Sequence, residues 1–106
     1  MTKIDIPFND WSKNKLIQCK KIATSRSKKY GEVGDFFEFQ GDKYIIVMIK
    51  KLPLWFIADV LYDSEGADSP DEFRNVWAKI HYRKPVDERK EYFYHFFKRI
   101  GYNAKM

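Results

Sequence analysis

The sequence predicts one α+β domain over residues 1–106, built as a small barrel-like β-sheet flanked by helices. Three observations favour this class. The length of 106 residues suits one domain of common size, and a chain that is 18% aromatic can build a real core. The predicted strands outnumber the predicted helices, and hairpins join several of them. The strand–helix–strand alternation that is typical of a parallel sheet is missing.

The N-terminal third is predicted to hold one helix between two extended segments. Residues 4–8 alternate apolar and polar side chains, which indicates a short edge strand. Asn9 or Asp10 can cap a helix over about residues 11–19. Its apolar face is expected to consist of Trp11, Leu16 and Cys19. A cysteine on such a face is more often a small core residue than a nucleophile. Residues 23–26 then form a short extended segment.

The middle of the chain is predicted to form a hairpin. Residues 36–39 indicate a strand, and Gln-Gly-Asp at 40–42 supplies the turn. The second strand covers residues 43–52. Its centre, residues 45–49, is apolar on both faces. A central strand that is covered on both sides explains that pattern best.

Two more helices and a final strand are predicted in the last half. Pro53 ends the long strand and can open a helix. Ser69 caps the next helix, with Pro70 at its first position and Glu72 three residues after the serine. The buried face of that helix is expected to comprise Phe73, Val76, Trp77 and Ile80. Residues 91–100 are dense in aromatic side chains and indicate a last core strand.

Positive charge is concentrated in the basic segment, residues 11–31, which holds seven basic residues and no acid in a chain of net charge +5. A basic block with aromatic neighbours is typical of nucleic-acid binding, although lysines that merely solvate a surface give the same pattern. The residues expected to bind a nucleic acid or another ligand are Lys20, Lys21, Arg26, Lys28 and Lys29.

Within this segment Lys21, Thr24 and Arg26 place an amine, a hydroxyl and a guanidinium within six residues. The set suits a polar, anionic or nucleotide-like ligand. A lysine with a lowered pKa can activate a threonine hydroxyl as a nucleophile. Alternatively, the two cations bind phosphates without catalysis and the threonine hydrogen-bonds to backbone. From the residues alone, the non-catalytic interpretation is favoured.

Several segments, taken in order, resemble the ASCH domain family, named for activating signal cointegrator homology. They are residues 20–26, 30–31, 33–35, 64–66, 69–73 and 94–97, together with Trp77 and His81. The resemblance extends over roughly residues 4–100. It implies a PUA-like β-barrel with flanking helices, and a cleft associated with RNA or modified nucleosides.

The resemblance also implies a site. Some small bacterial members deacetylate N4-acetylcytidine with a lysine, a threonine and a glutamate. Those roles fall on Lys21, Thr24 and Glu65, with Arg26 as a ligand-holding group. Where many members carry glycine before the lysine, this chain has Lys20.

The function expected first is therefore binding of RNA or another nucleic acid by a basic cleft around residues 21–26. The alternative is an amidohydrolase that deacetylates N4-acetylcytidine or a related acylated nucleoside. A third possibility is a protein–protein adaptor whose basic face is only solvated. These three classes differ in what would be measured: binding that depends on salt, turnover, or neither.

Metal, membrane and disulfide functions are not expected. No apolar run approaches the roughly 20 residues that span a bilayer, and the N-terminus lacks the apolar region of a signal peptide. Cys19 is the only cysteine, which excludes an internal disulfide and a cysteine zinc cluster. His81 and His95 have no cysteine or paired acid at ligand spacing. The expectation is a cytoplasmic protein without a cofactor.

Overall fold

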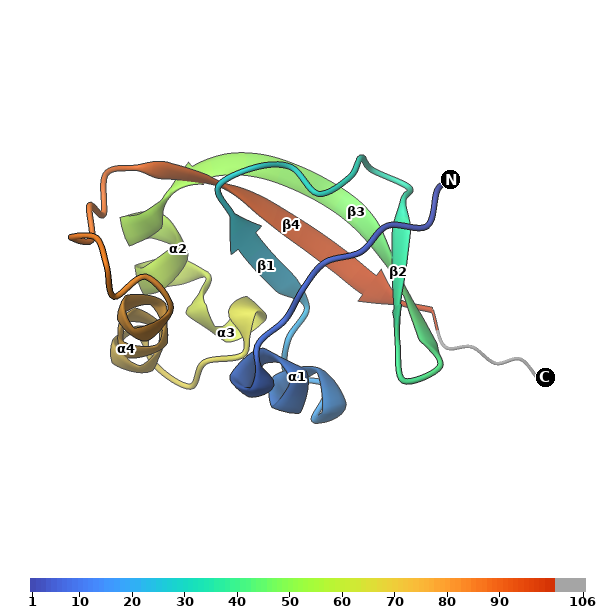
Figure 1. Ribbon diagram of the computed structural model, residues 1–106, viewed down its shortest axis with the longest axis horizontal. Coiled ribbons are helices and arrows are strands. Elements are labelled where there is room, and N and C mark those ends of the chain that lie inside the picture. The colour runs from blue at the N-terminus through green and yellow to red at the C-terminus, as the bar shows by residue number, and fades with distance from the viewer. Residues whose placement is uncertain (101–106) are drawn as a thin grey trace.

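The computed structural model describes residues 1–100 and confirms the α+β class (Figure 1). In chain order its elements are α1 (Asp10–Ile17), β1 (Ala23–Arg26), β2 (Phe36–Phe39), β3 (Asp42–Pro53), α2 (Leu54–Val60), α3 (Tyr62–Glu65), α4 (Pro70–Ile80) and β4 (Glu91–Arg99). The four strands form one antiparallel sheet in the order β1-β4-β3-β2. Helices α2, α3 and α4 lie together on one side of it (Figure 1).

The sheet curls without closing into a barrel, which corrects the predicted architecture. Strands β1 and β2 are its two edges. The N-terminal segment, residues 3–8, runs from the β2 edge toward α1 (Figure 1). Lys3 forms a parallel bridge with Phe36, and the Pro7 carbonyl accepts a hydrogen bond of 2.6 Å from the Arg26 side chain. A strand over residues 4–8 is therefore wrong, since Pro7 has no N–H and its carbonyl binds a side chain.

Helix α1 begins at the predicted place and ends two residues early. The side chain of Asn9, not Asp10, caps it by accepting a hydrogen bond of 2.8 Å from the Ser12 N–H. Leu16 is buried as predicted. Cys19 lies past the helix end with φ 61° and is exposed, so its prediction as a core residue is wrong. A left-handed residue ends the helical turn and points its side chain away from the apolar face.

Two apolar clusters pack around β4, and each uses different residues of that strand. The first consists of Ala23, Leu54, Ile57, Ala58, Ala67, Phe73, Trp77, Tyr92 and Tyr94. The second consists of Ile6, Leu16, Phe37, Tyr44 and Phe97. Successive side chains of a strand point to opposite faces. The final core strand is thus confirmed, and it carries the packing of both clusters.

Strand β3 lies between β2 and β4, as a central strand should, but its middle is covered on one side only. Val47 is 42% exposed and Met48 is 40% exposed, next to a β-bulge between Ile46 and Met48. The bulge breaks the alternation there. In α4 the Ser69 cap is confirmed at 3.1 Å, whereas Ile80 is 49% exposed because it lies in the last turn, before an exposed loop.

Candidate active site

A cavity of about 300 Å³ opens between the N-terminal segment, β1, α3 and α4. Its polar lining includes Lys21, Thr24, Ser25, Arg26 and Glu65. The same lining includes an aromatic wall of Trp11, Tyr30, Phe73, Trp77 and His81. The fold thus brings together the three residues that the family resemblance implied as catalytic, and Arg26 with them. Concave sites that combine apolar walls with a few polar groups are typical of small-molecule binding.

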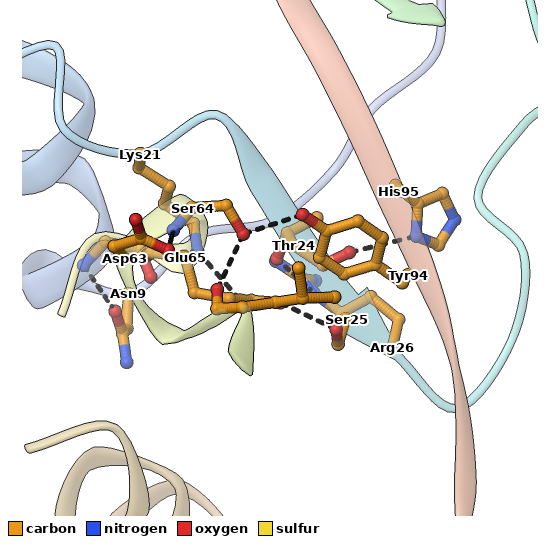
Figure 2. A network of polar contacts seen from close by, with 12 residues as sticks. Asn9, Lys21, Thr24, Ser25, Arg26, Asp63, Ser64, Glu65, Tyr94 and His95 are labelled. Carbon is orange, nitrogen blue, oxygen red and sulfur yellow. Dashed lines mark hydrogen bonds and ion pairs between the residues drawn. The ribbon is translucent and has the colours of Figure 1, made fainter. Parts of the chain in front are cut away.

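Lys21 and Glu65 form a buried pair on the lining of this cavity, with exposed fractions of 3% and 4%. Figure 2 shows their contact. The Lys21 Nζ donates to the Glu65 backbone carbonyl at 2.9 Å and to its Oε1 at 3.3 Å. Burial lowers the pKa of Lys21 and nearby Arg26 lowers it further, whereas Glu65 opposes the shift. The amine therefore loses its proton more readily than an exposed lysine.

Glu65 reaches this position because α3 ends abruptly. Gly66 follows with φ 107°, a left-handed conformation that costs glycine little. A Cβ at Gly66 would lie 2.9 Å from the Cβ of Lys15. The glycine thus allows α3 to approach α1 closely and holds the Glu65 carbonyl toward Lys21.

Ser25 is a site residue that the sequence analysis missed. Its Oγ donates to the Glu65 Oε2 at 2.6 Å, so both carboxylate oxygens have buried partners. Ser25 lies within the motif of residues 20–26, but a serine there does not by itself indicate a site residue. The structure reveals its role through β1, where Ala23, Thr24 and Ser25 are all buried.

Thr24 and Arg26 interact with each other on the same strand. The Arg26 Nε donates to the Thr24 Oγ1 at 3.2 Å. The guanidinium carbon lies 5.2 Å from the Phe8 ring centre and 5.4 Å from that of Tyr30, within cation–π range. Arg26 is thus held beside the hydroxyl between two aromatic rings.

Adjacent residues of β4 support this site from opposite sides of the strand (Figure 2). The Ser64 Oγ donates to the Leu61 carbonyl at 2.6 Å, so the Tyr94 hydroxyl donates to Ser64 Oγ at 2.6 Å. Burial raises the pKa of Tyr94 to about 12 and keeps its proton in place. On the other side, the His95 Nδ1 lies 3.2 Å from the Thr24 carbonyl.

The remaining predicted ligand-binding lysines lie outside the cavity lining. Lys20 is exposed and pairs with Asp68 at 3.5 Å, and Lys29 pairs with Glu32 at 3.2 Å. Lys28 lies 5.1 Å from the ring centre of Tyr30. Asp68 and Glu32 thus offset part of the positive charge of the basic segment.

The aromatic wall ends in a stacked pair. The rings of Trp77 and His81 are 4.4 Å apart between centres and tilted by 24°, and the His81 Nδ1 lies 3.0 Å from the Trp77 carbonyl. Offset rings at this separation attract one another. His81 has no role of its own in the sequence-based site, yet the structure places it on the cavity lining.

Solved structures of two bacterial proteins share this fold. One is an ASCH domain from Lactobacillus crispatus JV V101, with a TM-score of 0.61, 12% identity, and coverage of 92% of this chain and 78% of that one. The other is a protein from Enterococcus faecalis V583 assigned to the family model DUF984, with a TM-score of 0.61, 13% identity, and coverage of 93% and 75%. The ASCH-like fold that the motifs predicted is confirmed. No family model and no curated protein matches the sequence.

Two further features bear on the function classes. Among residues 1–100, no group of three or more histidine, cysteine, aspartate or glutamate side chains is placed to hold a metal ion. Within the same residues, every helix is too short or too polar to cross a bilayer.

Proposed function

We propose that the protein is an amidohydrolase that removes the acyl group from the N4 amide of a cytidine nucleoside. The observation that carries this proposal is the buried Lys21, whose pKa is lowered, in the same cavity as the Thr24 hydroxyl and the Glu65 carboxylate. A purely phosphate-binding lysine gains from remaining charged and accessible. A general base needs a neutral amine.

The two hydrogen bonds to Glu65 can also be made by the neutral amine, which burial favours. A neutral lysine carries two hydrogens and one lone pair, and the backbone carbonyl and Oε1 of Glu65 can accept both hydrogens. The lone pair is then free to accept the proton of Thr24. Glu65 thereby orients the base, while Ser25 fixes the carboxylate by donating to its other oxygen.

The reaction proceeds through an acyl-enzyme. Lys21 takes the hydroxyl proton as the Thr24 Oγ1 attacks the acyl carbon, and the carbonyl oxygen becomes negative. The Arg26 guanidinium, which lies beside Thr24, stabilises that charge. The C–N bond then breaks, and the Lys21 ammonium returns its proton to the leaving amino group. Water cleaves the Thr24 ester, with Lys21 again as the base, and releases a carboxylic acid.

The aromatic wall favours a planar leaving group. Trp77 and His81 present stacked rings to the cavity, and a pyrimidine can pack against such surfaces. The volume of about 300 Å³ is at the lower end of small-ligand pockets. A nucleoside is therefore a better substrate class than a peptide or a folded RNA.

The experiment is incubation of the purified protein with N4-acetylcytidine, with cytidine release followed by chromatography. The matched variants are Lys21→Ala and Lys20→Ala, which remove adjacent lysines that are buried and exposed respectively. We expect release by the wild type and by Lys20→Ala, and a loss of about 10²–10⁴-fold in Lys21→Ala. Equal rates in the two variants would reject the proposed base.

RNA binding is the second candidate, and one observation favours it. Exposed Lys28 lies over Tyr30, whose ring lines the cavity, so a cation stands near an aromatic surface at the site. If Lys20, Lys28 and Lys29 each contact one phosphate of a single strand, the binding constant falls roughly 20-fold between 50 and 200 mM salt. Affinity for an oligonucleotide that is absent, or flat over that range, would reject this candidate.

A further inference from the structure

His95 is a fully buried histidine whose ring links two parts of the site. Its exposed fraction is 0%, and both ring nitrogens have backbone partners. The Tyr30 N–H lies 3.1 Å from Nε2, and the Thr24 carbonyl lies 3.2 Å from Nδ1. The partners are distant in the sequence, at separations of 65 and 71 residues. The ring therefore holds β1 and the Tyr30 loop to the central strand β4.

The two partners determine which nitrogen carries the proton. A backbone N–H can only donate, so Nε2 must be unprotonated to accept from Tyr30. The hydrogen of a neutral imidazole then lies on Nδ1 and is donated to the Thr24 carbonyl. One neutral tautomer satisfies both contacts. In a doubly protonated ring the Nε2–H would point at the Tyr30 N–H, so two donors would meet without an acceptor.

Both partners are parts of the proposed site. Thr24 supplies the nucleophile, and it lies directly opposite His95 in the β1–β4 register. Tyr30 lines the cavity and packs against Arg26. Strand β1 has only four residues and is an edge of the sheet, so few backbone contacts fix it. A side-chain bond from β4 adds a constraint where the nucleophile is attached.

We propose that His95 is a positioning residue. In its neutral form it holds the Thr24 backbone and the Tyr30 loop in place, and it releases Tyr30 when it is protonated. Its catalytic consequence rests on the proposed function. The linkage itself does not, since it is a property of hydrogen bonds among Thr24, Tyr30 and His95.

Burial is the largest influence on the pKa of His95 and lowers it from its ordinary value of 6.5. Hydrogen bonds to the backbone of Thr24 and Phe93 raise this pKa. Nearby Arg26 on β1 lowers it further, whereas Glu65 on α3 raises it. The Tyr30 ring meets the imidazole edge-on, with centres 6.3 Å apart. The net effect is a lowered pKa of His95. The release is therefore expected below pH 6.5, and the neutral linkage is intact above it.

The test is a pH titration of the ¹⁵N-labelled protein by NMR, in the wild type and in His95→Gln. In the wild type we expect the ring nitrogens to show the Nδ1–H tautomer at neutral pH. The Tyr30 amide signal should then shift with the same midpoint as the ring. Glutamine offers an acceptor oxygen and a donor NH2 group but does not titrate. The Tyr30 amide signal of His95→Gln should therefore lack that midpoint.

A kinetic comparison tests the positioning role. At neutral pH, His95→Phe removes both bonds and should lower kcat/KM by about 10²-fold, the cost of a small misplacement at a reacting centre. His95→Gln should restore most of the loss. A Tyr30 amide that does not follow the ring, or an unchanged kcat/KM in His95→Phe, would overturn the proposal. A wild type that shows the linked titration but releases no cytidine would reject the proposed function and leave the linkage supported.

Discussion

Lys21 donates to both the backbone carbonyl and the carboxylate of Glu65, although 44 positions separate the two residues. The pair is almost completely buried, which is rare for an amine and a carboxylate unless each satisfies the other. A buried ion pair is weak support for stability, since desolvation offsets much of the attraction. Its place in the cavity lining is instead what includes it in the proposed function.

Removing one member of this pair should destabilise the fold more than removing both. Lys21→Met or Glu65→Leu leaves a buried polar group without its partner, at a cost of about 3–5 kcal/mol in the free energy of unfolding. The double variant should lose less than either single variant. Urea denaturation of all four proteins measures the coupling. Additive losses would show that the two side chains do not interact in solution.

The hydroxyl of Thr24 should be needed for turnover but not for folding. Thr24→Val keeps the shape of the side chain and removes the hydroxyl, so release of cytidine should fall by about 10²-fold or more. Thr24→Ser keeps a nucleophile and should retain measurable activity. Initial rates and thermal melting of both variants provide the check. Full activity in Thr24→Val would assign the nucleophile to another group, such as a bound water.

The rate should rise with pH through the titration of Lys21. Only the neutral amine can accept the Thr24 proton, and burial lowers the pKa of Lys21 from its ordinary value of 10.5. We therefore expect kcat/KM to fall as the pH drops below this lowered pKa and to level off above it. Because Glu65 raises the pKa of Lys21, Glu65→Gln should move the rise to lower pH. An unchanged pH profile of kcat/KM in Glu65→Gln would show that Glu65 does not influence the ionisation that controls the rate.

Gly66 should tolerate no side chain, and Gly41 offers a matched control. Both have positive φ, 107° and 85°, which costs an L-residue about 1–2 kcal/mol. A Cβ at Gly66 also meets Lys15 at 2.9 Å, whereas nothing lies within 4 Å of one at Gly41. Gly66→Ala should therefore lower the melting temperature more than Gly41→Ala. It should also impair turnover, because it displaces the adjacent Glu65. Equal effects in the two variants would mean that α1 and α3 separate freely.

Local signals in the sequence determined much of the fold. The serine–proline–glutamate start of α4, the cap at Asn9 and the Gly41 turn depend on residues only a few positions apart. Such signals act through backbone hydrogen bonds and allowed φ angles, which neighbours in the chain decide. The family resemblance of the motifs likewise pointed to Lys21, Thr24, Arg26 and Glu65, and all four line one cavity.

Only the tertiary structure decided how those residues are joined. Ser25 and His95 entered the site because β1 pairs with β4 and α3 packs onto β1, contacts that link positions 40 to 71 residues apart. Cys19 lies outside the core because α1 ends at Ile17 and the chain turns away at Cys19. The sheet is open between β1 and β2, and the N-terminal segment adds only the Lys3–Phe36 bridge to it. Burial and pairing across the chain depend on the whole packed core, which no short window of sequence contains.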